Sequence, residues 1–191
     1  MQYKEKEIVL KDGTKAILRS AVKEDAAIMR DFMIQTADQT DFLLSTSEDF
    51  RMKTVEDEAK WIESRMDDSG CILIVIKDGE MVANSDISFN TAHEKEKHRS
   101  SVGITVEKKY WDKGVGTIIF EELIKIAEKH EGTEQIELGV ISTNSRARHL
   151  YEKMGFKETG IIPRALKLPD GTYLDEILMT RFLENDNEES K

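Results

Sequence analysis

The sequence holds one cysteine and two prolines among 191 residues, and it has no long apolar run. The single cysteine, Cys71, excludes a disulfide framework within the chain, and its place in the apolar run 71–76 favours a buried strand residue over a nucleophile. No apolar stretch approaches the about 20 residues of a membrane-spanning helix. The charged residues 1–6 lack the apolar core of a signal peptide. These absences predict a cytoplasmic protein without a Pro-rich linker.

Positive charge is also in short supply. Lys and Arg number 28 against 38 Asp and Glu, which gives a formal net charge of −10. Nucleic acids and anionic membranes are held by basic surfaces, so we expect neither as a partner. The acidity fits a cationic substrate, although solubility alone would also explain it. His93 and His98 lack the spacing of helical metal ligands, so no metal site is expected.

Apolar residues make up 39% of the chain, which is enough for a sizeable core. The length predicts one domain, over residues 1–183. The remaining residues, 184–191, are polar and acidic, and we expect them to be a disordered tail.

Three Asp-Gly pairs, at 12–13, 78–79 and 170–171, each lie between two apolar runs. An Asp-Gly pair between strand-like runs is typical of a tight β-hairpin. Three such hairpins predict a substantial antiparallel sheet.

Helical spacing of apolar residues over 23–37 and 54–67 predicts two helices between the first two hairpins. Thr54 and Asp57 form a capping box at the start of the second helix, with Asp in the place where Glu is usual. The stretch 38–53 between the two helices is predicted to be irregular. It is a candidate lid or substrate loop, and an ordinary connection is the alternative.

A glycine-bearing segment between a strand and a helix indicates anion binding. Residues 102–106 are predicted to form a strand, and Gly114 to Thr117 open a helix with an apolar stripe. A helix N-terminus exposes N–H groups and carries about half a positive charge. Gly114 and Gly116 let a phosphate approach the backbone, although a tight turn without ligand explains the spacing equally well. The spacings of a P-loop and of a dinucleotide-binding loop are absent.

A second segment follows the same order of strand, turn and helix. The strand is predicted over 135–140, and the apolar face of the helix consists of Ala147, Leu150, Tyr151 and Met154. Gly155 fits the position just after the helix, where Phe156 packs back beneath it. From the residues alone, Asn144 is a helix cap and Tyr151 a core residue.

The two segments together resemble the GCN5-related N-acetyltransferase (GNAT) superfamily. The family's phosphate motif, Gln/Arg-x-x-Gly-x-Gly/Ala, is matched at 111–116, with Trp111 in the Gln/Arg place. Its later signature, Asn-x-x-Ala-x-x-Leu-Tyr-x-x-x-Gly-Phe, is matched at 144–156. With the flanking elements, the resemblance extends over about 15–182. It implies a GNAT-like α/β (α+β) fold with a mixed, mostly antiparallel central sheet of about 6–7 strands and flanking helices.

The resemblance also implies direct transfer of an acetyl group from acetyl-CoA to an amine, without an acyl-enzyme. Tyr151 is the implied proton donor to the leaving thiolate, and the Val106 N–H is the implied donor to the thioester oxyanion. Asp86 is a candidate base by its position on a strand, and a water relay is the alternative. The implied CoA-binding residues are Ile104, Thr105, Val106, Lys113, Gly114, Val115, Gly116, Thr117, Asn144 and Tyr151.

The acceptor amine is not specified by the motifs. Asp38, Asp41 and Asp175 are candidate substrate-binding residues, because carboxylates attract a cationic amine. Polyamines, amino acids, aminoglycosides and protein N-termini all stay open, as do a longer acyl donor and an alcohol acceptor. The non-enzyme alternative is an acyl-CoA-binding or regulatory module that keeps the anion-binding segment but does not catalyse transfer. The last hairpin could pair between chains, which would make a homodimer.

Overall fold

The computed structural model describes residues 2–183, and the expected acidic tail at 184–191 lies outside the described residues. The strands are β1 (Lys6–Val9), β2 (Lys15–Ser20), β3 (Gly70–Lys77), β4 (Glu80–Phe89), β5 (Arg99–Val106), β6 (Gln135–Ile141), β7 (Lys157–Lys167) and β8 (Tyr173–Phe182). The α-helices are α1 (Ala26–Ala37), α2 (Ser47–Met52), α3 (Val55–Glu63), α4 (Val115–Lys129) and α5 (Ser145–Lys153).

The strands are hydrogen-bonded in the order β1-β2-β3-β4-β5-β6-β8-β7. β5 and β6 pair in parallel through Arg99–Ser101, whereas the pairs β1–β2, β2–β3, β3–β4, β6–β8 and β7–β8 are antiparallel. The prediction of a mixed, mostly antiparallel sheet is therefore confirmed. The described chain has eight strands instead of six or seven, because three hairpins contribute six and β5 and β6 complete the set.

The chain packs into two compact units. The first holds the described residues up to Ser88 together with Gly103–Ile119, and the second holds Phe89–Val102 together with the described residues from Phe120 onward. β5 and α4 contribute to both units. One domain over 1–183 stays a prediction.

All three Asp-Gly pairs form the expected hairpin turns. In the turn between β3 and β4, Asp78 and Gly79 have φ angles of 52° and 83°, the left-handed conformation that a two-residue turn requires. In the other two turns, the Asp side chain accepts a hydrogen bond from the N–H group two residues later. Local turn chemistry therefore decides where the sheet reverses.

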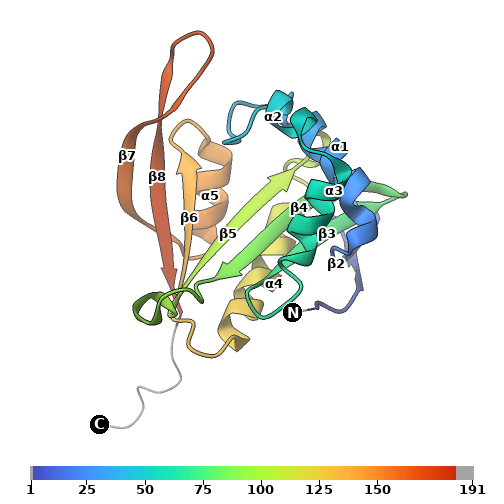
Figure 1. The fold of residues 1–191 in the computed structure, drawn as a ribbon, viewed down its shortest axis with the longest axis horizontal. Coiled ribbons are helices and arrows are strands. Elements are labelled where there is room, and N and C mark those ends of the chain that lie inside the picture. Colours follow the sequence, from blue (N-terminus) through green and yellow to red (C-terminus); the bar gives the residue numbers. More distant parts are fainter. Residues whose placement is uncertain (1, 184–191) are drawn as a thin grey trace. The chain divides into compact units, whose positions relative to one another are not determined.

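In the first unit, α1 and α3 lie together on one face of the strands (Figure 1). Their buried side chains share a core with β3 and β4, made of Ala26, Met29, Phe32, Ala59, Ile62, Ile72, Ile74 and Met81. The predicted capping box of α3 is confirmed, because Thr54 Oγ1 accepts from the Asp57 N–H at 3.1 Å and Asp57 accepts from the Thr54 N–H at 2.9 Å. The helix ends at Glu63, four residues before the predicted end.

The stretch 38–53 was predicted to be irregular, but only part of it is. Its second half forms α2, whose capping box joins Thr46 and Asp49. The sequence pattern missed this helix because a six-residue segment contains too few turns to establish a period. The irregular parts are 38–46 and Lys53.

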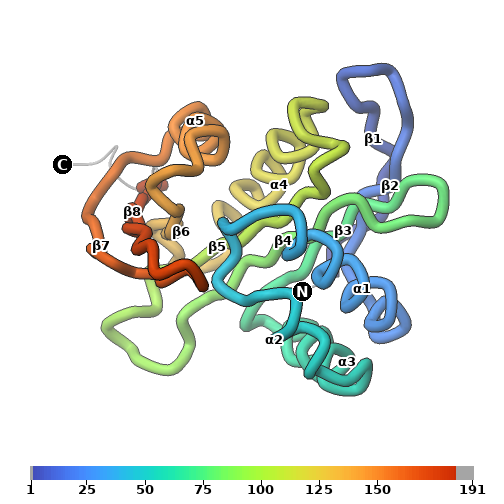
Figure 2. Tube along the Cα trace, turned by 90° about the horizontal axis from the view of Figure 1, so that it is seen from above, coloured from blue at the N-terminus to red at the C-terminus, as the bar shows by residue number. Residues whose placement is uncertain are grey.

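In the second unit, α5 lies beside β6 in both views (Figures 1 and 2). The Phe120 ring of α4 packs against Tyr151 and Phe156, with ring centroids 5.1 and 5.9 Å away. Gly155 has a φ angle of 86°, so it ends α5 as predicted and turns Phe156 back into this cluster.

Cys71 is a buried free thiol, and burial raises its pKa. The thiol therefore stays protonated at neutral pH, as expected of a core residue. In the part of the chain that the structure describes, no helix is long and apolar enough to cross a membrane. Among residues 2–183, no three His, Cys, Asp or Glu side chains gather as metal ligands.

Candidate functional site

The loop before α4 has the backbone geometry of an anion cradle. Asp112 and Gly114 have φ angles of 62° and 86°, which bend the chain so that successive N–H groups face one side. Among the described residues, no acceptor binds the N–H groups of Gly114, Val115, Gly116 or Thr117, and the first bond into the helix runs from Ile118 N to Gly114 O at 3.1 Å. These N–H groups are free for a ligand.

The first hairpin supports this loop. The Lys11 N–H donates to the Lys113 carbonyl at 2.9 Å, and Lys113 Nζ lies 3.0 Å from an Asp12 carboxylate oxygen. Hydrogen bonds from Thr14 and Lys113 hold the pKa of Asp12 well below its usual range. The side chain of Lys113, an implied CoA-binding residue, is therefore paired with a carboxylate. No sequence pattern indicated this pairing, because Asp12 and Lys113 lie far apart in the chain.

Trp111, the departure from the family motif, is turned toward β5. Its indole Nε1–H donates to the Val106 carbonyl oxygen at 2.8 Å. Ile104, Thr105 and Val106, the predicted CoA-binding strand residues, are half-buried at this end of β5. The cradle and the strand end are thus joined within the first unit.

Asp86, the candidate base, lies on β4 in the same unit. Its Oδ1 atom is 3.1 Å from the point that a Cβ atom would occupy on Gly103. Burial raises the pKa of Asp86, while the Arg65 charge and the Ser88 hydroxyl oppose this increase. A raised pKa brings a carboxylate closer to the range in which it can act as a base near neutral pH. Gly103 makes room for this carboxylate because it lacks a side chain.

Asn144 and Tyr151 belong to the second unit. Asn144 caps α5, where its Oδ1 accepts from the Ala147 N–H at 3.2 Å. Capping uses only the carbonyl oxygen of the side-chain amide. No acceptor among residues 2–183 binds its Nδ2, which is therefore available to donate to a ligand carbonyl.

Tyr151 is a buried residue of the aromatic cluster, with 7% of its surface exposed. Its hydroxyl makes no hydrogen bond within the described chain, and burial raises its pKa to about 12. The phenol is therefore protonated over the whole physiological range and can only donate to an incoming anion. This position is compatible with two roles for Tyr151: a core residue, as its spacing suggested, and a hydrogen-bond donor to a ligand.

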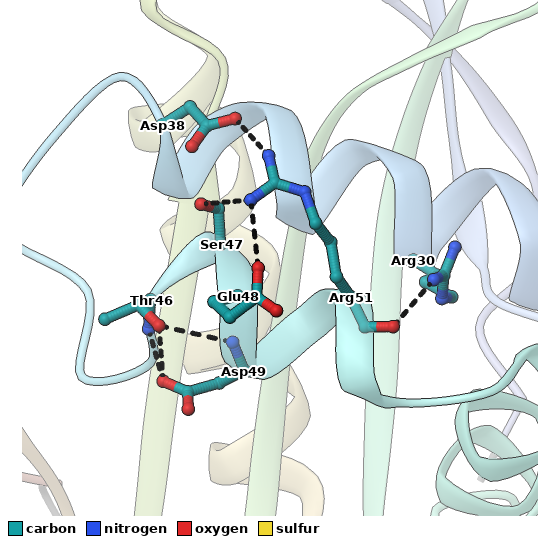
Figure 3. Close-up of polar contacts among 7 residues, drawn as sticks. All are labelled: Arg30, Asp38, Thr46, Ser47, Glu48, Asp49 and Arg51. Atoms are coloured by element: carbon teal, nitrogen blue, oxygen red, sulfur yellow. Dashed lines mark hydrogen bonds and ion pairs between the residues drawn. The ribbon is translucent and has the colours of Figure 1, made fainter.

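Asp38 is held by Arg51 (Figure 3). Arg51 Nη2 donates to Asp38 Oδ2 at 2.8 Å, and Arg51 Nη1 donates to Ser47 Oγ at 2.9 Å. Hydrogen bonding from Ser47, followed by Arg51, lowers the pKa of Asp38. Arg51 thereby bridges the start and the end of the loop 39–46, a role that no sequence motif indicated. Asp41, in the middle of that loop, is exposed.

Asp175 lies on β8, in the second unit. Its Oδ1 accepts from the Arg164 N–H at 2.8 Å, and its backbone carbonyl accepts from the Ser142 N–H at 2.9 Å. Arg164 has a φ angle of 54°, at the irregularity in the β7–β8 register. One carboxylate oxygen thus stabilises a bent strand, and the other is free of this role.

One glutamine in α1 and one just after it contact the turn that follows β5. No sequence motif indicated these contacts. Gln35 Nε2 donates to the buried Glu107 at 2.9 Å, and Gln39 Oε1 accepts from the Lys108 N–H at 3.0 Å. The start of the loop 39–46 is therefore fixed next to the end of β5. Long-range side-chain bonds of this kind leave no periodic trace in a sequence.

Comparisons with known proteins point to one family of enzymes. A family model described as the acetyltransferase (GNAT) family matches residues 34–156. The L-amino acid N-acetyltransferase AaaT of Escherichia coli (strain K12) is 28% identical over 109 residues, which cover 57% of this chain and 66%, just under two thirds, of that protein.

Solved structures show the same fold. An acetyltransferase of the GNAT family from Streptococcus pneumoniae has a TM-score of 0.82 and 25% identity, over 88% of this chain and 99% of that chain. The yncA structure from Salmonella typhimurium, solved with its cofactor acetyl-CoA, has a TM-score of 0.77 and 19% identity, over 92% of this chain and 98% of that chain.

Proposed function

The chain belongs to the acetyltransferase (GNAT) family, and on that premise we propose that it transfers an acetyl group from acetyl-CoA to a primary amine. The observation that carries the proposal is the set of free N–H groups from Gly114 to Thr117, at a helix start where two glycines lack side chains. This arrangement fits a pyrophosphate, because N–H donors and the helix dipole both favour a compact anion.

Each residue of the proposed site has a separate task. The N–H groups of 114–117 bind the pyrophosphate, whereas the Lys113 N–H already donates to the Tyr110 carbonyl at 3.4 Å. Ile104, Thr105 and Val106 offer backbone groups to the pantetheine arm. Asn144 donates to the arm through Nδ2. Acetyl-CoA supplies a thioester whose acetyl group passes directly to the amine, and the Val106 N–H stabilises the oxyanion that develops on its carbonyl.

Tyr151 is proposed to assist the leaving thiolate. With a pKa of about 12, its hydroxyl arrives protonated and donates a hydrogen bond to the sulfur. A thiol is a stronger acid, with an ordinary pKa of about 8.5. The hydrogen bond therefore stabilises the thiolate, and complete proton transfer requires that the bound ligand lowers the pKa of the phenol.

Asp86 is proposed to take a proton from the acceptor ammonium, directly or through water. An amine attacks only in its neutral form, so the site needs a proton acceptor. The raised pKa and the partial burial of Asp86 support this assignment. Its carboxylate then has to be ionised when substrate binds, which a cationic amine favours.

The acceptor is proposed to be a primary amine of a small molecule or of a protein N-terminus. The L-amino acid specificity in the name of the Escherichia coli relative makes free amino acids the first class to try. Asp41 and Asp175 are proposed contacts for the ammonium group, and Asp38 contributes less because Arg51 neutralises it. We further propose a cytoplasmic location and a homodimer formed through the last hairpin.

The test is release of free CoA thiol from acetyl-CoA in the presence of single amines, starting with L-amino acids, then short peptides, then polyamines and aminoglycosides. Thermal shift with CoA alone measures binding separately, because a ligand that binds the folded state raises the melting temperature. Thiol release with at least one amine supports the proposal. Stabilisation by CoA without release for every amine favours the non-catalytic binding module instead.

A further inference from the structure

Trp111 closes the turn between β5 and the cradle. Its Nε1–H donates to the Val106 carbonyl at 2.8 Å. Within the same turn, Tyr110 N donates to Glu107 O at 2.8 Å and Trp111 N donates to Lys108 O at 3.1 Å. Backbone and side-chain hydrogen bonds together therefore hold residues 106–111 in a closed turn, which leads directly into the cradle.

The direction of the Val106 peptide groups follows from its neighbour. The Glu107 N–H donates to the Val82 carbonyl of β4 at 3.0 Å. In an extended chain, successive residues point their N–H and C=O groups to opposite sides. Val106 therefore points its N–H and C=O groups away from β4. On that side, the Trp111 indole N–H donates to the Val106 carbonyl oxygen.

This bond has an electrostatic consequence for a developing oxyanion. N–H donors stabilise such an oxyanion, whereas an exposed carbonyl oxygen on the same side repels it. The indole N–H of Trp111 covers the Val106 carbonyl and fixes the orientation of the residue. The Val106 N–H then remains the polar group that this residue offers on that side.

We propose that Trp111 is a positioning residue, which fixes the acetyl-transferring end of β5 to the pyrophosphate cradle through its indole N–H. The inference rests on the proposed function, since it needs the Val106 N–H to act on the thioester. It also gives the motif departure a purpose: the side chain serves the strand end through a bond that a phenylalanine at the same place cannot make.

The first experiment is kinetic. Trp111→Phe keeps an aromatic ring and removes the donor, and we expect it to lower kcat about tenfold while the KM for acetyl-CoA stays within about threefold, because misplacement acts on the reacting geometry more than on binding. The matched control is Trp61→Phe, the same change at the other tryptophan, which packs against the α1 and α3 core and should leave kcat unchanged. A Trp111→Phe kcat within twofold of wild type, even with a lower melting temperature, overturns the proposal.

The second experiment does not depend on turnover. Because the chain has two tryptophans, ¹⁵N-indole labelling gives two Nε1–H signals, which Trp61→Phe assigns. We expect the Trp111 signal to exchange slowly with solvent and to shift when CoA saturates the protein. A rapidly exchanging signal, or one that CoA leaves in place, overturns the proposal. Absence of acetyl transfer by the wild type contradicts the proposed function instead, and the indole signal still decides the role of Trp111.

Discussion

The Oδ1 atom of Asp86 lies 3.1 Å from the point that a Cβ atom would occupy on Gly103. The neighbouring strands β4 and β5 therefore leave room for a carboxylate by omitting a side chain. Burial at this place raises the pKa of Asp86, so the folded protein retains its proton to a higher pH than the unfolded chain does. A stability effect and a catalytic effect both follow.

The stability effect is a pH dependence. Because the folded-state pKa of Asp86 is raised, stability falls as pH rises from the ordinary value of 3.8 through the raised pKa. Asp86→Asn cannot ionise, so its melting temperature should exceed that of wild type at pH 7. At about pH 3, where both states of the wild type are protonated, the difference should vanish. Thermal melts across pH measure this, and an equal difference at both pH values would contradict it.

The catalytic effect is a loss of turnover. If Asp86 is the base, Asp86→Asn should lower kcat/KM by about a hundredfold or more at neutral pH and should remove the acidic limb of the pH–rate profile. A profile that superposes on that of wild type would exclude Asp86 and favour the water relay. Asp31→Asn, at an exposed carboxylate of α1, is the matched control.

Tyr151→Phe should separate binding from turnover. Its hydroxyl makes no hydrogen bond within the described chain, so its removal breaks no bond and should leave the melting temperature unchanged. CoA affinity should stay within about threefold, while kcat falls about tenfold to a hundredfold as the thiolate loses its donor. Isothermal titration and thiol release measure the two quantities. Unchanged turnover removes Tyr151 from the mechanism.

Gly114→Ala should weaken CoA binding. A φ angle of 86° costs a residue with a Cβ atom about 1–2 kcal/mol, and the new methyl would lie 3.2 Å from Lys11 Cγ on the side that supports the cradle. Gly132→Ala is the control, because Gly132 has a φ angle of 82° and nothing within 4 Å of the added atom. Both variants should lose similar stability, and Gly114→Ala alone should raise the Kd for CoA. Equal CoA affinity in the two variants would argue against the cradle.

The acidic residues of the loop after α1 should differ in their effect on the acceptor. Asp38 is paired with Arg51 at 2.8 Å, whereas Asp41 is exposed within the loop. Asp41→Asn should therefore raise the KM for a cationic amine about twofold to fivefold at low salt, with a smaller effect at high salt, because exposed charges are screened. Asp38→Asn should have less effect on the KM. The opposite ranking would mean that Arg51 releases Asp38 to the substrate.

The sequence by itself determined the features that depend on local chemistry. The Asp-Gly pairs specified three hairpins, Thr54 and Asp57 specified a helix start, and Gly155 specified a helix end, because turns and caps are formed by residues a few positions apart. The two family motifs located the cradle and α5 for the same reason, since each motif spans a single turn and helix. The short helix α2 was not predicted, because its six residues contain too few turns to show a helical period.

Only the tertiary structure decided how these pieces are supported. Arg51 forms an ion pair with Asp38, and Lys113 forms one with Asp12. The Trp111 indole donates a hydrogen bond to the Val106 carbonyl. Each of these contacts depends on which residues the fold brings within reach. Burial likewise sets the protonation of Asp86 and Tyr151, since desolvation depends on what packs around a group and not on its neighbours in the chain. The motifs named most residues of the proposed site, and the fold decides their hydrogen-bond partners and burial.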